Sequence, residues 1–548
     1  MSTVVWRTTI VNAIFKNKGT RELAEFYRGI SIVYLMAKIF DIILLNRFKK
    51  WFVPSDLQTA YQEEMSTADH IFLQRCLISY ARKVKQKLFI ISIDFDGAFD
   101  RVSRSVLIKK LCRFGAGANF VSCIASMYLK TDNIIFHDGE HIIYTLFAGI
   151  KQGLPLSPLL FLFYVNDIFS LFDDVHKNTG NVIYEIVHVL MHADDANILA
   201  STRDIAIRKM KTLLEYCNLN CIIPQYKKCE FIAINGDEKD RESIPFGCKE
   251  LKHVTHLESL GSHLSASGKL SEDLKLHMEV RYKACIKYYN FLRENKLAPL
   301  QVKLKVLSAC VGNSLLYNCE TFGDLIPPDL EKDYTKLLRR TLNVRNNTPA
   351  LTLYIESGFL PVKALILARQ FKFFKRYRTR ALENNTPRCV LFAKLLSEPT
   401  GYLNHYLSLQ ENFDDVEQIY RNAAEEVKAK LRAFADNGQY KYEIYRDMNP
   451  SLQRSPFIDN LHGLSGDIIR FRLGSHILPI ETGRWSRTER QDRLCRTCNV
   501  LGDERHALFR CTAVDRDMLD LPESISEVWE SNDIFTLFKK LKKADLLE

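Results

Sequence analysis

The sequence predicts a mixed α/β first half and a mostly helical second half. Residues 88–93, LFIISI, form a short and nearly continuous apolar run, which is typical of a strand buried on both faces. Residues 203–219 instead repeat apolar residues with helical spacing, and this spacing predominates from about residue 270 onward. Three of the 14 cysteines gather near the C-terminus, which indicates a small module there.

The remaining elements follow from the same periodicities. Helical spacing predicts helices over 32–52, 104–114 and 119–129, and an apolar helix over 158–172. Strand-like runs cover 142–147 and 229–234, and a hairpin is expected over 187–201. Strands and helices therefore alternate through the first half of the chain.

The length and composition bound the architecture. A chain of 548 residues with 47% hydrophobic residues is expected to form two to four domains, because single cores stop growing near ~250–300 residues. No run reaches the ~18 apolar residues that a membrane span needs. Arg7, Lys16 and Lys18 interrupt any signal-like segment. We therefore expect an intracellular protein that does not enter a membrane, with its scattered cysteines reduced.

Basic residues concentrate in two runs of the second half. The net charge of +11 is a mild preference for polyanions. Residues 275–305 hold eight Lys or Arg and two Glu, and residues 363–380 hold seven Lys or Arg and no acid. Either run alone could be a solvated helix face, but the two together favour a surface that binds nucleic acid. The second run also contains four aromatic residues, Phe371, Phe373, Phe374 and Tyr377.

Three aspartates lie at predicted turns next to apolar strands. Asp194 and Asp195, in MHADDANILA, stand at the turn of the hairpin, and Asp94 follows the strand 88–93. Each could be an ordinary turn or capping residue. If the strand lies beside the hairpin, however, three carboxylates meet, and their repulsion calls for cations. Oxygen ligands favour Mg²⁺, and two such ions suit phosphoryl transfer.

A loop rich in glycine and proline, AGIKQGLPLSP, separates these aspartates. Gly149 and Gly153 permit backbone conformations that other residues resist and allow a base pair to approach closely. Gln152 can hydrogen-bond a base or a sugar, while Pro155 and Pro158 stiffen the start of the next helix. A merely rigid turn is the alternative interpretation.

The C-terminal module carries four candidate zinc ligands. Cys495, Cys498, His506 and Cys511 are spaced C-x2-C-x7-H-x4-C, which fits one tetrahedral structural Zn²⁺. A CxxC pair with a chance histidine and cysteine is the alternative.

Eight segments resemble, in order, the reverse transcriptases of non-LTR, LINE-type retrotransposons. The match of AGIKQGLPLSPLLFLFYVNDI to the family's G.RQG.PLSP.LF..Y.ND pattern is very specific. HADD stands where the family usually has YADD or FADD. The eight segments are 26–48, 58–77, 93–102, 148–168, 192–195, 226–231, 256–274 and 315–322.

The resemblance implies a right-hand polymerase fold with fingers, a palm built on an antiparallel sheet and a helical thumb. A mostly α-helical C-terminal region with a small zinc knuckle is expected to follow. The implied domains are 1–265 (fingers and palm), 266–350 (thumb), 351–485 (helical region) and 486–548 (CCHC zinc-knuckle-like module and tail). The family's N-terminal endonuclease is not expected here, because the polymerase segments begin almost at residue 1.

The metal ligands carry over by position from the resemblance. Asp94, Asp194 and Asp195 would ligate two Mg²⁺ or Mn²⁺ ions. The backbone carbonyl of Ile93 or Phe95 would be an additional metal ligand, and Phe95 is the preferred candidate.

A second set of residues would act on the substrates. Phe99 would be the steric gate against a 2′-hydroxyl, and Gln152 and Gly153 would contact the template and the incoming base pair. Arg28, with Lys16 or Lys18 as further candidates, would clamp the triphosphate.

The remaining roles concern the leaving group and the primer. Lys228 would protonate the departing pyrophosphate. Leu260 and Gly261 would belong to the primer grip, and the helical run 275–305 would hold the template–primer duplex.

Three positions depart from the family pattern. His192 replaces an aromatic residue, Cys229 stands where threonine is common, and residues 63–65 are Glu-Glu-Met where relatives tend to carry basic and glycine residues.

The resemblance implies an RNA-directed DNA polymerase of a retrotransposon, with an RNA template, a DNA primer or target and dNTPs as partners, located in the nucleus and the cytoplasm. Two alternatives remain open. One is an inactive RNA-binding remnant or co-opted host protein. The other is an RNA-directed RNA polymerase, because Asp94 and Asp100 are spaced like the sugar-reading pair of those enzymes.

Overall fold

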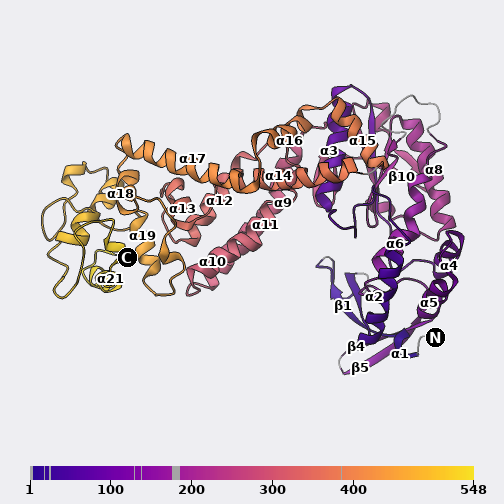
Figure 1. Ribbon diagram of the computed structural model, residues 1–548, viewed down its shortest axis with the longest axis horizontal. Helices are drawn as coiled ribbons and strands as arrows, with labels where there is room; N and C mark the ends of the chain where they lie inside the picture. Colours follow the sequence, from indigo (N-terminus) through magenta and orange to yellow (C-terminus); the bar gives the residue numbers. More distant parts are fainter. Residues whose placement is uncertain are drawn as a thin grey trace. The chain divides into compact units, whose positions relative to one another are not determined.

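A computed structural model gives the fold, which Figure 1 shows. It describes residues 4–17, 19–23, 26–128, 130–137, 139–175, 186–383 and 385–547. The chain divides into two compact units. Unit 1 comprises Met1–Asp273 and Lys375–His405, and unit 2 comprises Leu274–Phe374 and Tyr406–Glu548.

A six-stranded sheet forms the centre of unit 1. Its order is β6-β7-β3-β8-β10-β9, and all neighbours are antiparallel except β8 and β10. The predicted strand 88–93, the strand near 229–234 and the hairpin are thus confirmed. The strands are β3 (Leu88–Ile93), β6 (Val189–His192), β7 (Asp195–Ala200), β8 (Glu230–Ile234), β9 (Ile244–Phe246) and β10 (Lys249–His253).

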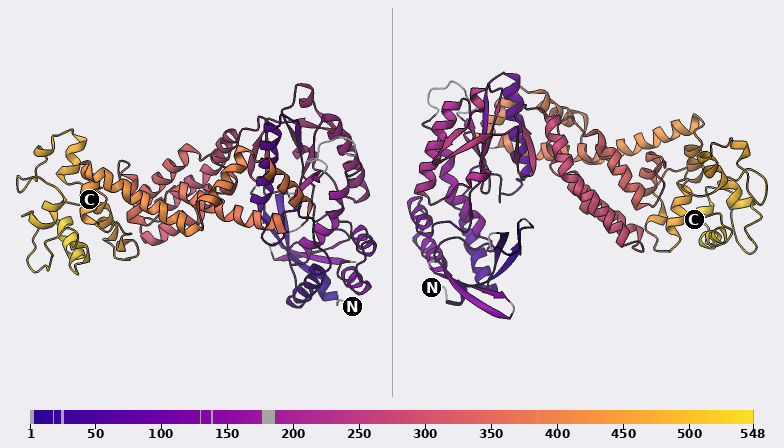
Figure 2. Two further views of the ribbon diagram at one scale, coloured as in Figure 1. Left: turned by 45° about the horizontal axis from the view of Figure 1, so that its top comes forward. Right: turned by 180° about the vertical axis from the view of Figure 1, so that it is seen from behind.

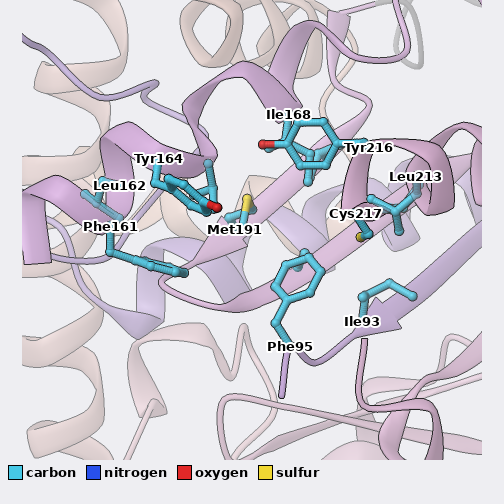
Figure 3. Packing of buried hydrophobic residues seen from close by; sticks show 14 of the residues in the cluster. Ile93, Phe95, Phe161, Leu162, Tyr164, Ile168, Met191, Leu213, Tyr216 and Cys217 are labelled. Atoms are coloured by element: carbon cyan, nitrogen blue, oxygen red, sulfur yellow. The ribbon is translucent and has the colours of Figure 1, made fainter. Parts of the chain in front are cut away.

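Both faces of β3 are covered, as its continuous apolar run predicts. Phe89, Ile91 and Ile93 join the main hydrophobic core, which includes the side chains of α6 (Ser157–Val165) and α8 (Arg203–Leu219). Figure 3 shows this packing close to Ile93 and Met191. Leu88 and Ile90 alternate to the opposite face, where α3 (Thr67–Lys83) contacts β6 and β8. A predominantly apolar strand is therefore required at this position.

The apolar helix predicted over 158–172 is shorter than expected. The structure ends α6 at Val165 and continues as a 3₁₀ helix over Asn166–Ser170. Asp167 in this 3₁₀ turn accepts hydrogen bonds from Lys110 and Tyr216, at 2.8 and 2.6 Å. Both partners lie on other helices. The local sequence pattern therefore does not reveal the contacts that accompany the change from α-helix to 3₁₀ helix.

Unit 1 contains two further sheets. A four-stranded sheet has the order β2-β1-β4-β5. Figure 1 labels its strands β1, β4 and β5, and Figure 2 shows the same region from two other directions. Its strands are β1 (Thr8–Phe15), β2 (Tyr27–Ile32), β4 (Thr131–His137) and β5 (Glu140–Leu146). The third sheet is the hairpin of β11 (His256–Ser259) and β12 (Ser262–Ser265). Residues 1–273 of unit 1 also contain four helices, α1 (Val4–Arg7), α2 (Leu35–Lys49), α4 (Arg104–Arg113) and α5 (Ala118–Tyr128).

The interpretation of residues 363–380 as an aromatic nucleic-acid track is wrong. The four aromatic residues of this run lie on α14 (Val362–Glu383) and are at most 4% exposed, so no base can stack on them. Within unit 1, the Arg376 and Arg380 guanidinium groups pair with the fully buried carboxylate of Asp69 at the start of α3. Helix α15 (Pro387–Ser397) follows in the same unit. The buried residues are Phe371, Phe373, Phe374 and Tyr377.

Unit 2 is helical, as predicted. Within it, the Arg472 guanidinium donates to the buried Glu356 carboxylate at 2.8 Å. In the described part of the chain, no single helix has the length and apolarity to cross a membrane, and one bent pair, α13 with α14, qualifies on length and composition alone. The helices include α9 (Leu270–Glu294), α10 (Leu300–Val306), α11 (Asn313–Leu315), α12 (Pro328–Thr341), α13 (Ala350–Ser357), α16 (Gly401–Asn412), α17 (Val416–Asp436), α18 (Tyr440–Met448), α19 (Ser465–Arg472), α20 (Pro479–Trp485) and α21 (Ile534–Lys543).

Candidate active site

The sheet register brings the three predicted aspartates together. Ile93, the last residue of β3, pairs with Ala196 in β7. Asp94 follows Ile93, and Asp195 precedes Ala196 on the antiparallel strand, so the two aspartates lie across from each other at one end of the sheet. Asp194 occupies the turn between β6 and β7. The aspartates therefore converge although Asp94 and Asp194 are 100 positions apart in the sequence.

The electrostatics of the site follow from the closeness of the three carboxylates. Burial, together with the charges of Asp194 and Asp94, raises the pKa of Asp195 to about 6. Burial also raises the pKa of Asp194, with Asp94 again acting in the same direction. Partly buried carboxylates that oppose one another's ionisation form a donor set whose repulsion a divalent cation would relieve, and oxygen-only donors fit Mg²⁺.

Two basic side chains that are distant in sequence offset part of this negative charge. Lys228, in a short 3₁₀ turn (Tyr226–Lys228), forms an ion pair with the Asp94 carboxylate. The charge of Lys228 offsets part of the rise in the pKa values of Asp194 and Asp195, and the charge of Arg28 in β2 does the same for Asp194. The structure thus places Lys228 and Arg28 near the carboxylates, while their predicted roles toward pyrophosphate and triphosphate stay predictions.

The glycine loop is held against the chain's own backbone. Gly153 has φ 124°, and a Cβ there would lie 2.6 Å from the Ser31 carbonyl oxygen. Gly149 has φ 83°, and its Cβ would lie 2.6 Å from the Asp100 carbonyl oxygen. Both positions therefore require glycine for internal packing, which supports the rigid-turn alternative. Gln152 donates from Nε2 to the Asp100 carboxylate at 2.9 Å.

Phe99, on the loop that follows Asp94, packs against two other aromatic rings. Its ring stacks on Phe161 of α6 with centroids 4.8 Å apart, and Tyr61 meets it edge-on at 6.4 Å. Phe95 is buried, and its backbone bridges to Pro224. These contacts fix both residues, so a gate at Phe99 would be rigid.

The predicted primer-grip residues form the turn of a hairpin. Leu260 and Gly261 have φ values of 48° and 71°, so both central residues of this two-residue turn are left-handed, as tight hairpins of one type require. The hairpin contacts β8, which neighbours β3 in the central sheet. The charge of its Glu258 adds to the burial and the aspartate charges that raise the pKa of Asp195.

One of the two lysines considered for the triphosphate, Lys16, lies directly after the first strand of the chain. Burial raises the pKa of Asp100, and the charge of Lys16, which follows β1, acts in the opposite direction. Lys18 lies outside the described residues. Lys16 is thus near the glycine loop, to which Asp100 is hydrogen-bonded through Gln152.

Sequence reasoning missed Gln58. This side chain is 1% exposed and hydrogen-bonds both backbone groups of Ala193, the residue before Asp194. The segment QTAYQ belongs to one of the eight family-like segments, but local sequence carries no signal for a contact with a residue 135 positions away.

The four C-terminal ligands also converge. The ligand atoms of Cys495, Cys498, His506 and Cys511 all lie within 4.8 Å of one another. The Sγ atom of Cys511 lies 3.8 Å from that of Cys495 and 3.9 Å from that of Cys498. Zn–S bonds of ~2.3 Å in a tetrahedral site separate sulfur atoms by roughly 3.8 Å. These two sulfur separations therefore fit a zinc ion.

Unit 2 contains a basic groove of about 700 Å³. Among the residues that the structure describes, no ion pair with a carboxylate neutralises the cations that line it. Cations gathered around one groove favour a polyanionic ligand. The five cationic side chains come from α9, α10, α12 and the segment after α9, and they are Arg293, Lys296, Lys303, Lys336 and Arg340.

Comparison with known proteins identifies the class of protein. Residues 15–264, which contain the three aspartates, match the family described as "Reverse transcriptase (RNA-dependent DNA polymerase)". This part of the chain thus matches the reverse transcriptase family. Within that family the chain is related to the polymerases of non-LTR retrotransposons, as the following relatives show.

Three relatives illustrate this relationship. The Pol polyprotein of the type-2 retrotransposable element R2DM from Drosophila melanogaster is 23% identical over 54% of this chain and 29% of its own length. A Pol polyprotein of a type-1 element R2 from Bradysia coprophila is 28% identical over 32% of this chain and 20% of its own length. The RNA-directed DNA polymerase of the mobile element jockey from Drosophila melanogaster is 21% identical over 60% of this chain and 36% of its own length.

The chain thus spans well under half the length of each of these three relatives. Among solved structures, apo telomerase from Candida tropicalis is similar, with a TM-score of 0.38 and 13% identity over 69% of this chain and 64% of that chain.

Proposed function

We propose that the protein is an RNA-directed DNA polymerase that extends a primer 3′-hydroxyl with dNTPs on an RNA template. The observation that carries this proposal is the convergence of Asp94, Asp194 and Asp195 at one end of the central sheet, inside the part of the chain that matches the reverse transcriptase family. A structural role alone would not explain three neighbouring carboxylates with opposed ionisation.

The three aspartates would hold two divalent cations, Mg²⁺ or Mn²⁺. Such ions, when bound, stabilise the attacking and leaving oxygens of phosphoryl transfer. The chain's own contribution is to fix the carboxylates on a strand end and a tight turn, whose positions the sheet register determines. The Phe95 carbonyl is the additional ligand in this proposal.

Other residues act on the incoming nucleotide in the proposal. Phe99 excludes a 2′-hydroxyl with a ring held by Phe161. Arg28 lies near Asp194 and would bind the triphosphate, and Lys228 would protonate the leaving pyrophosphate after release from Asp94.

The loop and the hairpin would contact the nucleic acid. Gln152 and Gly153 would lie against the template and the base pair, and the Leu260–Gly261 turn would contact the primer. The nearness of this hairpin to Asp195 supports the second of these roles, because the primer end must reach the carboxylates.

The second half would hold nucleic acid and zinc. The basic groove supports the assignment of residues 266–350 to a thumb that binds a template–primer duplex. The cluster of Cys495, Cys498, His506 and Cys511 supports a structural Zn²⁺ in residues 486–548. Residues 1–265 would be fingers and palm, and residues 351–485 a further helical region.

Primer extension tests the proposal. Purified full-length protein is incubated with an RNA template, an annealed DNA primer and dNTPs, with Mg²⁺ or with EDTA. Mg²⁺-dependent extension supports the proposal. Template binding without extension in either Mg²⁺ or Mn²⁺ would favour the non-catalytic RNA-binding alternative.

A further inference from the structure

We propose that Gln58 is a positioning residue that holds the turn carrying Asp194. This inference rests on the proposed polymerase function, and it concerns a side chain to which the site described above assigns no task. The turn between β6 and β7 contains only Ala193 and Asp194. Its shape therefore decides where the Asp194 carboxylate lies.

The turn has an unfavourable backbone conformation at its first residue. Ala193 has φ 57°, in the left-handed region, where a side chain with a Cβ is disfavoured. Glycine, asparagine or aspartate is the usual residue at such a turn position. An alanine stays in this conformation only when the surrounding structure holds it there.

Gln58 supplies the groups that hold it. Its Oε1 accepts a hydrogen bond from the Ala193 backbone N–H at 2.8 Å, and its Nε2 donates to the Ala193 carbonyl oxygen at 3.2 Å. Oε1 also accepts from the Ala60 backbone N–H at 3.1 Å. Oε1 therefore accepts from two N–H groups, and Nε2 donates to one carbonyl. These partners determine which way the side-chain amide of Gln58 is oriented.

Gln58 is itself held by the edge of the central sheet. The Met191 N–H donates to the Leu57 carbonyl at 3.0 Å, and the Thr59 N–H donates to the Met191 carbonyl at 2.9 Å. These bonds form a short parallel bridge between Gln58 and Met191 of β6. Thr59 Oγ1 also lies 2.9 Å from Nδ1 of His192. The backbone of residues 57–59 is thus in register with β6, and the Gln58 side chain reaches from there to the turn.

The burial of Gln58 makes the contact specific. At 1% exposure, water cannot replace a lost amide group, so removing it leaves the Ala193 N–H and carbonyl without these partners. The turn would then relax away from its left-handed conformation and move Asp194. A displacement of ~1 Å at a reacting centre can cost about 100-fold in rate.

Gln58→Met tests this role, with Gln62→Met as the matched control. Gln62 belongs to the same segment and donates from Nε2 to the Ser55 carbonyl at 2.9 Å and to the Gln58 backbone carbonyl, so it helps to hold the same loop, but these bonds do not reach Ala193. Gln58→Met is expected to lower kcat for Mg²⁺-dependent primer extension by roughly 10- to 100-fold. The KM values for dNTP and template–primer should stay within about twofold of the parent. Gln62→Met should leave kcat within about threefold of the parent.

A second variant and a second readout keep the test decisive. Gln58→Glu keeps an acceptor for the Ala193 N–H and loses the donor to its carbonyl, so its kcat should fall between those of the parent and Gln58→Met. Mn²⁺ binding, followed by electron paramagnetic resonance, should weaken in both Gln58 variants and not in Gln62→Met. Parent-like kcat and Mn²⁺ affinity in folded Gln58→Met and Gln58→Glu would overturn the proposal.

The Mn²⁺ readout separates this inference from the proposed function. If the parent binds Mn²⁺ but does not extend primers, the proposed function fails, while the comparison of Mn²⁺ affinities still decides the role of Gln58. If the parent extends primers and the Gln58 variants match it, only the positioning role fails.

Discussion

Asp94 lies across from Asp195 in the central sheet, one register step beyond the pair formed by Ile93 and Ala196. This relationship joins the end of β3 to the start of β7 and places both carboxylates near Asp194. The antiparallel pairing of β3 with β7 is thus what assembles the candidate site.

The raised pKa of Asp195 predicts a stability gain from Asp195→Asn in the metal-free protein. The folded-state pKa is about 6 against an ordinary value of 3.8, so folding disfavours the ionised form. The contribution of this group to stability is complete at low pH and is lost as the pH rises through about 6. Asp195→Asn should therefore raise the free energy of unfolding by about 1–3 kcal/mol at neutral pH.

Chemical denaturation in EDTA measures this gain. The gain should shrink as the pH falls below the folded-state pKa of about 6, and Mg²⁺ should stabilise the parent more than the variant at neutral pH. A gain of the same size in acid and at neutral pH would contradict the assigned electrostatics.

The ring of Phe99 is predicted to select deoxynucleotides. Phe99→Ala should raise rNTP use relative to dNTP use by roughly 10-fold or more, because the ring that would meet a 2′-hydroxyl is gone. Phe136→Ala, which removes a 60% exposed ring on β4, is the control and should leave the ratio unchanged. Equal use of rNTPs and dNTPs by the parent would instead favour the RNA-directed RNA polymerase alternative.

The C-terminal cluster is predicted to hold one zinc ion per chain. The double variant Cys495→Ser/Cys498→Ser should lose this zinc, because two of the four ligands are removed. The exposed pair Cys112→Ser/Cys310→Ser provides the control and should keep it. Mass spectrometry measures the zinc content of each protein. Unchanged zinc in Cys495→Ser/Cys498→Ser would contradict the assignment of these residues as zinc ligands.

The basic groove of unit 2 is predicted to contact phosphates. Lys336→Ala/Arg340→Ala should weaken RNA binding. The slope of log K against log salt concentration should become less steep by the equivalent of about one to two phosphate contacts. Lys430→Ala, which removes a cation already paired with Glu426 on α17, should change the salt dependence little. Fluorescence anisotropy at several salt concentrations gives both slopes, and identical slopes would exclude the groove from binding.

Local periodicity predicted much of the fold because it reports burial directly. The strand 88–93 and the helix 203–219 have the bounds that their apolar patterns indicate. The convergence of the aspartates was also predictable, because a strand-end acid and a hairpin-turn acid meet when the two strands are neighbours in this register. The convergence of the aspartates required only the assumption that the strand 88–93 lies beside the hairpin.

Other features depend on contacts that no local pattern contains. The aromatic residues of 363–380 resembled a stacking surface, yet tertiary packing buries them. Gln58 reaches Ala193 across 135 positions, and the cations near the carboxylates come from β2 and from residue 228. Long-range partners of this kind are decided by the tertiary fold, so a single sequence does not reveal them.

Primer extension by Asp194→Asn is the decisive measurement for the proposed polymerase site, with Asp96→Asn as the control. Asp96 is an exposed carboxylate paired with Arg101, close in sequence to Asp94. We expect Asp194→Asn to abolish Mg²⁺-dependent extension on an RNA template while RNA binding stays near that of the parent, and Asp96→Asn to remain active. Extension by Asp194→Asn at the parent's rate would contradict the assignment of the site.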